Sequence, residues 1–121
     1  MTIQECYQKM GGDYEEVLGR MMNPGFVRKF IARFPGDDSY QKLCEEIKAG
    51  NREGAFRAAH TLKGVCKNLG FGTLADSADK MTELLRPKAD TIPEGAEEIL
   101  VQVTKDYETT LEALQEYLAA E

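Results

Sequence analysis

The chain has 121 residues, which is enough for one domain with a buried core and too short for two ordinary domains. Its formal charge of −6, from 15 Lys and Arg against 21 Asp and Glu, argues against a protein that binds nucleic acid over its whole surface, because phosphate backbones require positive potential. Four prolines and the lack of any alternating β-branched stretch favour an all-α fold.

The N-terminal segment and the cysteines exclude further classes. Residues 1–6 lack a basic segment followed by an apolar stretch, and no window approaches the roughly 18 apolar residues of a membrane span. We therefore expect a cytoplasmic protein that does not insert into a membrane. Cys6, Cys44 and Cys66 are far apart and form no Cys-x-x-Cys pair, so we predict neither a disulfide nor a metal site and interpret them as small core or half-buried residues.

The chain should begin with short helices. Thr2 and Glu5 have the spacing of a capping box, and the helix that they start should stop at Gly11-Gly12. Asp13 can cap a second helix that runs to about Met22. These signals predict two helices before residue 23, of which the second is short.

A third and a fourth helix follow. Asn23-Pro24 combines an N-cap residue with proline at the first helical position, and apolar residues at helical spacing continue to Phe34 before Pro35-Gly36 ends the run. Acidic and capping residues then precede a predicted helix over 39–49, and Gly50 stands where a C-cap glycine is expected.

Two longer helices are expected in the middle of the chain. Asn51 can cap a helix over 52–69, which the Gly-Phe-Gly turn at 70–72 should end. Thr73, with Asp76 three residues later, then predicts a helix over 74–86.

The last helix is predicted over 92–119. A loop at 87–90 separates it from the preceding helix, and Thr91 with Glu94 forms a second capping-box pattern at its start. Four substantial helices with short connections indicate an antiparallel four-helix bundle with short additional N-terminal helices across one end. We treat residues 1–121 as one domain, with the bundle core at about 37–120.

A helical wheel of residues 52–69 divides them into an apolar and a polar arc. The apolar arc, which we expect to face the core, comprises Ala55, Ala58, Ala59, Leu62, Val65, Cys66 and Leu69. His60, the single histidine of the chain, lies near the centre of the opposite arc. A lone histidine is usually an ordinary surface or core residue, so its neighbours decide its interpretation.

Three cations lie beside His60 on this arc. Arg57 and Lys63 are three residues away from it and Lys67 is seven residues away, in a chain that is otherwise acidic. Such a cluster is typical of a surface that receives an anionic ligand or an acidic partner. The alternative interpretation is an ordinary solvated helix face.

Gly64 and Phe56 are unusual residues for a polar helix face. Glycine inside a helix costs about 1 kcal/mol relative to alanine, so Gly64 indicates that something must approach this face closely. Packing of another helix would explain it too, but the wheel turns Gly64 away from the core. Phe56, one turn before His60, either contacts the N-terminal helices or forms the hydrophobic edge of a docking surface.

These residues carry a family resemblance. The segment 59–64 reads Ala-His-Thr-Leu-Lys-Gly and continues through Leu69-Gly70 and Leu74, which resembles the signature helix of histidine-containing phosphotransfer (HPt) domains. The following helix departs from the family pattern, since Met81-Thr82 stands where a Leu-Glu pair is frequent and Lys67 where a small residue is frequent. The resemblance implies a four-helix bundle that exchanges phosphoryl groups with receiver-domain aspartates in two-component phosphorelays.

The resemblance assigns His60 as the phosphoacceptor, and general chemistry agrees, because an exposed neutral imidazole can attack an aspartyl phosphate in line. Lys63 would offset charge on the phosphoryl oxygens, while Arg57 and Lys67 would attract the acidic, magnesium-holding pocket of the receiver. Gly64 would leave room for the partner and Phe56 would border it. The module itself should need no cofactor.

The expected partners are a response-regulator receiver domain and a histidine kinase, either direct or hybrid, and we expect a monomer. A kinase is disfavoured because the chain has no room for a nucleotide-binding domain, and a metal-binding bundle because a single outward histidine cannot form paired Glu-x-x-His motifs. We therefore predict no enzyme. The remaining alternative is an adaptor or histidine-kinase inhibitor that docks through the same face without being phosphorylated.

Overall fold

The computed structural model describes residues 1–120, and every regular element in that range is helical. In chain order these elements are α1 Ile3–Met10, α2 Tyr14–Met21, α3 Pro24–Ile31, the 3-10 turn η1 Phe34–Gly36, α4 Ser39–Lys48, α5 Arg52–Leu69, α6 Gly72–Leu85 and α7 Ala96–Ala119. The all-α prediction is confirmed. No helix within residues 1–120 is both long and apolar enough to cross a bilayer.

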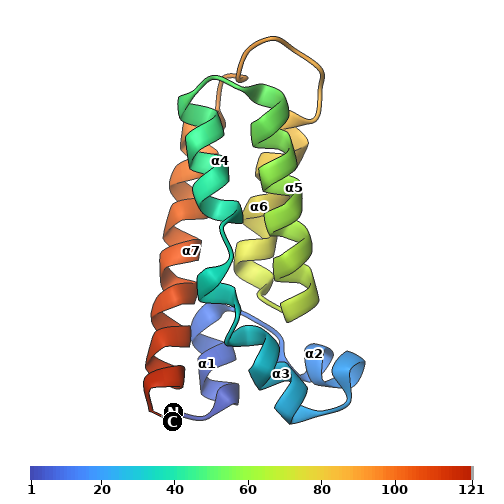
Figure 1. Ribbon diagram of the computed structural model, residues 1–121, viewed down its shortest axis with the longest axis vertical. Helices are drawn as coiled ribbons and strands as arrows, with labels where there is room; N and C mark the ends of the chain where they lie inside the picture. The colour runs from blue at the N-terminus through green and yellow to red at the C-terminus, as the bar shows by residue number, and fades with distance from the viewer. Residues whose placement is uncertain (121) are drawn as a thin grey trace.

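Helices α4 to α7 form an up-down-up-down bundle, with α5 and α6 side by side and α7 running the full length of the molecule (Figure 1). Helix α1 packs along the part of α7 that lies beyond α4, while α2 and α3 lie at the end of the bundle where α5 finishes (Figure 1). The expected four-helix bundle with N-terminal helices across one end is therefore the observed architecture.

One continuous core holds these elements together. Its largest fully buried side chains come from every long helix and from α1 to α3, among them Tyr7, Ile31, Leu43, Leu62, Phe71, Leu74, Met81, Leu85 and Leu114. Cutting one of the buried leucines back to alanine costs about 2–5 kcal/mol in a core of this kind. Cys6 and Cys66 are buried and Cys44 is half-buried, as the sequence indicated.

The predicted N-terminal boundaries are largely correct. The Thr2 and Glu5 side chains form the complete capping box, Asp13 and Asn23 cap α2 and α3, and Gly11 ends α1 in a left-handed conformation with φ 66°. The third helix ends at Ile31 and is therefore shorter than predicted. Phe34 lies in η1 instead, where proline at the start of the turn needs no backbone N–H partner.

Two later boundaries were wrong. Helix α6 starts at Gly72, because burial of Phe71 in the core leads the chain directly into the helix, and the Thr73 hydroxyl donates to the Gly11 carbonyl (3.2 Å) instead of capping. Helix α7 starts at Ala96, without the predicted Thr91 and Glu94 capping box.

The late start of α7 has a local cause. Pro93 disfavours helical backbone at the residue before it, and Gly95 has φ 92°, a left-handed conformation that interrupts a helix. The loop between α6 and α7 consequently spans residues 86–95 and is longer than predicted. Arg52, in the first turn of α5, anchors the beginning of this loop by donating to the carbonyls of Leu85 (2.6 Å) and Ala89 (2.9 Å).

Candidate functional site

Helix α5 carries the candidate site, and both of its ends are well defined. The Asn51 side chain accepts a hydrogen bond from the Gly54 backbone N–H, 3.1 Å away, and Gly70 ends the helix with φ 72°. Six of the seven residues expected on the core face are buried, and Val65 is half-buried. His60 is exposed in the middle of the opposite face, so its predicted placement is confirmed.

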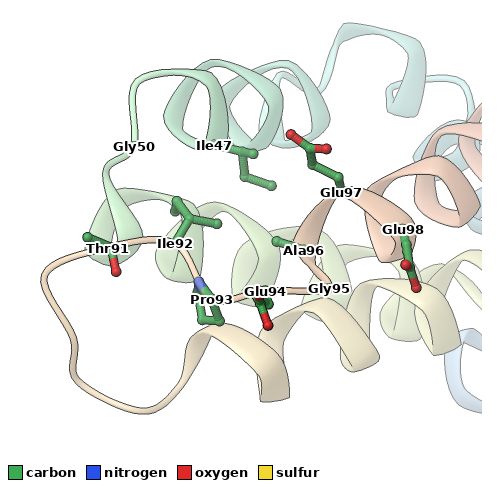
Figure 2. A pocket seen from close by; sticks show the side chains of 10 residues that line it. All are labelled: Ile47, Gly50, Thr91, Ile92, Pro93, Glu94, Gly95, Ala96, Glu97 and Glu98. Atoms are coloured by element: carbon green, nitrogen blue, oxygen red, sulfur yellow. The ribbon is translucent and has the colours of Figure 1, made fainter.

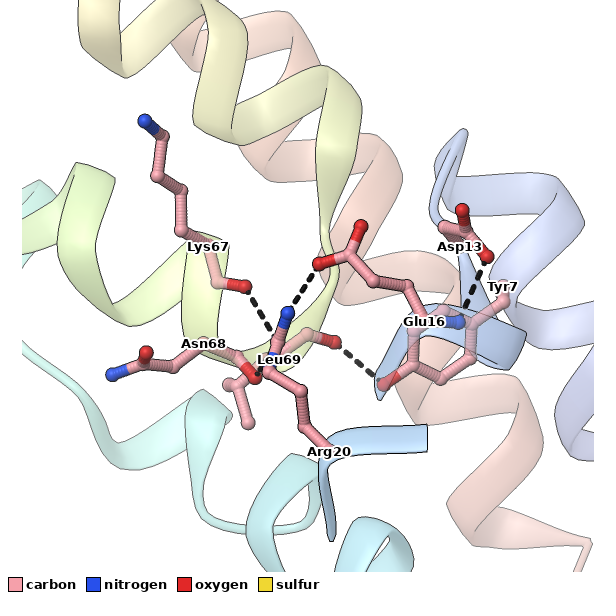
Figure 3. Close-up of polar contacts among 7 residues, drawn as sticks. All are labelled: Tyr7, Asp13, Glu16, Arg20, Lys67, Asn68 and Leu69. Carbon is pink, nitrogen blue, oxygen red and sulfur yellow. Dashed lines mark hydrogen bonds and ion pairs between the residues drawn. The ribbon is translucent and has the colours of Figure 1, made fainter. Parts of the chain in front are cut away.

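The carboxyl end of α5 is anchored by the N-terminal helices. Arg20 of α2 donates to the carbonyl oxygens of Lys67 (2.9 Å) and Asn68 (2.7 Å), as Figure 3 shows. The Tyr7 hydroxyl of α1 donates to the carbonyl oxygen of Leu69 (2.7 Å). The last carbonyls of a helix have no partner within it, so these bonds satisfy groups that would otherwise require water. Helix α5 is thereby attached to α1 and α2 at the end remote from Asn51.

The imidazole of His60 lies against an aromatic ring. The rings of Phe56 and His60 are nearly parallel, with an interplanar angle of 6° and centroids 6.0 Å apart. Phe56 is half-buried, and the guanidinium carbon of Arg86, just after α6, lies 5.3 Å from the centroid of its ring. No side chain or backbone group within residues 1–120 hydrogen-bonds to the His60 ring nitrogens.

The position of Phe56 rules out a contact with the N-terminal helices, one of the two interpretations of this residue. Phe56 lies about 20 Å along the helix from Leu69, where α5 meets α1. Its neighbour is Arg86 and not the N-terminal helices, so a contact with those helices does not explain it. The interpretation as part of a docking surface stays a prediction.

The three cations differ in their surroundings. Arg57 forms an ion pair with Glu53 one turn earlier, and both side chains are largely exposed. The Lys63 ammonium lies 2.8 Å from Asp79 Oδ1 of α6, and its side chain is only 18% exposed. Lys67 is exposed, and its ammonium forms no ion pair with residues 1–120. Of the three, Lys67 therefore has the charge most available to an approaching anion.

Gly64 faces open space. A Cβ atom built on it would meet nothing within 4 Å, which excludes packing of another helix as the reason for this glycine. Gly54, in the first turn of the same helix, differs, because a Cβ there would come within 1.9 Å of the Glu46 carboxylate of α4. Gly64 therefore leaves space on the solvent side of α5, whereas Gly54 leaves space for a side chain of the neighbouring helix α4.

Sequence reasoning missed the contribution of α6. Asp79 pairs with Lys63, and Glu83 accepts two hydrogen bonds from Arg86, at 3.0 Å and 3.1 Å. The hydrogen bond from Lys63 lowers the pKa of Asp79, and the hydrogen bonds from Arg86 lower the pKa of Glu83. The spacing of Asp79, Glu83 and Arg86 places them on one helix edge. Only the packing of α6 on α5 brings that edge beside His60.

Several surface hollows border α5, and two of them differ clearly in the side chains that line them. One, of about 800 Å³, lies beside Phe56 and is lined by four cations, Arg52, Arg57, Arg86 and Lys88, against two carboxylates. The other, of about 420 Å³, is a mainly apolar groove between α5 and the N-terminal helices, lined by Met21, Phe30, Phe34, Val65 and Leu69 among others. It begins one residue after Gly64.

A third hollow lies at the loop before α7 and is lined by Ile47, Gly50 and residues 91–98, as Figure 2 shows. Its polar side chains include Glu94, Glu97 and Glu98, and no residue of α5 lines it. We therefore separate it from the His60 site. Among residues 1–120 no group of three or more His, Cys, Asp or Glu side chains is arranged to hold a metal ion.

Comparison with protein-family models places the chain in a family. The family model described as Hpt domain matches residues 27–120, which include α4 to α7 and the whole of the His60 site. Helices α1 and α2 precede the matched residues. No curated protein and no solved structure matches the chain.

Proposed function

Because the chain belongs to the Hpt domain family, whose members carry phosphoryl groups in two-component phosphorelays, we propose that His60 is its phosphoacceptor. In this proposal His60 exchanges the phosphoryl group with the aspartate of a response-regulator receiver domain. The observation that carries it is an exposed imidazole in the middle of α5 whose ring nitrogens make no hydrogen bond within residues 1–120. Such a nitrogen is free to act as a nucleophile.

The transfer step follows from the chemistry of an acyl phosphate. The lone pair of an imidazole nitrogen forms the N–P bond while the bond between phosphorus and the aspartyl oxygen breaks, and the carboxylate leaves with the electron pair. The imidazole then loses the proton on its other nitrogen. Catalysis in phosphoryl transfer consists largely of positioning and charge stabilisation, so the neighbours of His60 act by location and charge.

The roles of the other site residues differ with their surroundings. Lys63, one turn after His60, would offset charge on the phosphoryl oxygens, and until they arrive it is held by Asp79. Lys67 attracts the acidic pocket of the receiver, and Arg57 contributes less because Glu53 already compensates its charge. Gly64 lets the receiver backbone approach, since nothing occupies the space in front of it.

The docking face extends beyond these residues. The apolar groove beside Val65 and the hydrophobic ring of Phe56 lie on either side of His60 along α5 and offer apolar area to a partner. Residues 1–121 act as one unit in this proposal, because α1 and α2 hold the end of the helix that carries the site.

The test is incubation of the chain with a receiver domain that carries an aspartyl phosphate, followed by detection of acid-labile phosphate on the chain. We expect phosphate on the parent protein and none on His60→Gln, which keeps the exposed position polar. Phosphate that persists in His60→Gln contradicts the assignment. Stable binding to a receiver or a histidine kinase with no phosphate transferred would favour the alternative, an adaptor or kinase inhibitor.

A further inference from the structure

We propose that Phe56 and Arg86 are positioning residues that hold the imidazole of His60 in the orientation required for in-line attack. This inference rests on the proposed phosphoacceptor role of His60. It goes beyond the role predicted for Phe56 at the edge of a docking surface, and it assigns a role to Arg86.

A single ring contact restrains the imidazole of His60. His60 is exposed and makes no hydrogen bond within residues 1–120, so its side chain would be free to change rotamer if nothing else contacted it. The one ring contact that it makes is with Phe56, nearly parallel at 6° and 6.0 Å between centroids. This distance falls in the range of favourable aromatic pairs.

The geometry of this contact suits a nucleophile. The lone pair of an imidazole nitrogen lies in the plane of the ring and points away from its edge. A hydrogen bond to that nitrogen would orient the ring but would occupy the lone pair. A nearly parallel, offset ring beside the imidazole restrains its orientation and leaves the nitrogen available for the N–P bond. Phe56 therefore provides orientation without competing for the reacting atom.

Arg86 fixes the position of Phe56 in turn. Its guanidinium lies over the Phe56 ring at 5.3 Å, within the range of cation–π contacts, and is itself held by Glu83 through two hydrogen bonds of 3.0 Å and 3.1 Å. Planar guanidinium groups stack on aromatic rings in a way that an ammonium group does not. The contacts therefore run from Glu83 through Arg86 and Phe56 to His60, and they connect α6 to the reactive side chain.

The experiment uses phosphoramidate, a small phosphoryl donor that needs no docking surface. The imidazole forms its N–P bond as the P–N bond of phosphoramidate breaks, and ammonia leaves. We expect Phe56→Leu, which keeps apolar volume but loses the planar ring, to be phosphorylated about tenfold more slowly than the parent, since small misplacements of reacting groups cost one to two orders of magnitude. Phe56→Tyr, which restores the ring, should react close to the parent rate.

Further variants isolate the effect. Phe26→Leu removes an exposed ring on α3 and should leave the rate unchanged. Arg86→Lys keeps the positive charge but loses the planar guanidinium group. It should slow the reaction by about twofold to fivefold, which is the free energy of an exposed cation–π contact expressed as a rate ratio. The proton signals of the imidazole in NMR spectra should shift in Phe56→Leu, because the ring current of the neighbouring ring disappears, and should stay in place in Phe26→Leu.

The outcomes that overturn the inference are distinct. If Phe56→Leu reacts normally with phosphoramidate and loses only transfer from a receiver domain, Phe56 serves docking and not positioning. If Phe56→Tyr fails to react at the parent rate, stacking with an aromatic ring does not orient the imidazole. If Arg86→Lys reacts at the parent rate, Arg86 does not contribute to this orientation. A parent protein that accepts phosphate from neither donor refutes the proposed function, and this inference with it.

Discussion

The Lys63 ammonium of α5 lies 2.8 Å from Asp79 Oδ1 of α6, so the lysine closest in sequence after His60 is paired across the helix interface before any phosphoryl group arrives. In the proposed function, a phosphoryl group on His60 would be an anion like the Asp79 carboxylate and would compete with it for the same ammonium. We therefore expect Asp79 to oppose retention of the phosphoryl group, both by holding Lys63 and by direct repulsion.

We therefore predict that Asp79→Asn shifts the transfer equilibrium toward phosphorylated His60. Ion pairs of exposed carboxylates are weak, so we expect a shift of no more than about fivefold in the equilibrium constant. The measurement is the ratio of phosphohistidine to aspartyl phosphate after equilibration with a receiver domain. Glu112→Gln, an equal charge change at an exposed position of α7, should have no such effect. An unchanged ratio in Asp79→Asn would show that Lys63 does not reach the phosphoryl group.

The same pair predicts a pH dependence of stability. Because the hydrogen bond from Lys63 lowers the pKa of Asp79 in the folded chain, the pair stabilises the fold above the ordinary carboxyl pKa of 3.8 and loses that contribution as the pH falls through the lowered value. The difference in melting temperature between the parent and Asp79→Asn should be full at about pH 6 and shrink below the ordinary pKa. A difference that stays constant with pH would exclude the charged pair as its source.

Substitutions at Gly64 should affect the stability of the fold and phosphoryl transfer in opposite directions. Since a Cβ at this position meets no atom within 4 Å, Gly64→Ala should raise the free energy of unfolding by up to about 1 kcal/mol through helix propensity and a less flexible unfolded chain. Gly54→Ala is the matched control, because its Cβ must displace the Glu46 carboxylate and should stabilise less. Chemical denaturation of both variants measures this.

The functional part of the Gly64 prediction uses a larger side chain. Gly64→Gln should fold normally but transfer phosphate from a receiver domain far more slowly, because displacement of the partner by about 1 Å can cost roughly a hundredfold. Phosphoramidate, which needs no close approach of a protein backbone, should still phosphorylate it. Normal transfer from the receiver to Gly64→Gln would remove the argument that this glycine provides clearance.

Tyr7→Phe tests whether the N-terminal helices support α5 without taking part in the chemistry. The Tyr7 hydroxyl is buried and donates to the Leu69 carbonyl, so its removal should cost about 1–2 kcal/mol and lower the melting temperature by several degrees. Leu69 lies about 13 Å along the helix from His60, so transfer by the folded protein should stay at the parent rate. Tyr14→Phe, whose hydroxyl makes no such bond, is the control.

Much of the fold could be predicted from sequence because its signals are local. The Thr2 and Glu5 capping box, the Asn51 cap and Gly70 each determine a helix end through residues within one turn. The errors arose where a longer-range or competing effect decided the boundary. Burial of Phe71 moved the start of α6, and Pro93 with Gly95 prevented the capping box predicted at Thr91.

The candidate site shows the same division. The helical period alone placed His60 and Gly64 toward solvent, and both are exposed. The pairing of Lys63 with Asp79 and the contact of Arg86 with Phe56 depend on the register between α5 and α6, which no pattern within either helix contains. Sequence therefore predicted which side chains face outward but not which of them are already paired.

The central claim is that a ring nitrogen of His60 takes a phosphoryl group from a receiver aspartate. Its most direct test is the ³¹P NMR spectrum of a phosphorylated receiver domain after addition of this protein. We expect the acyl-phosphate resonance to be replaced by the resonance of a phosphorus bound to an imidazole nitrogen, and we expect no such replacement with His60→Gln. A spectrum in which the parent protein produces no P–N resonance, or in which His60→Gln produces the same one, would contradict it.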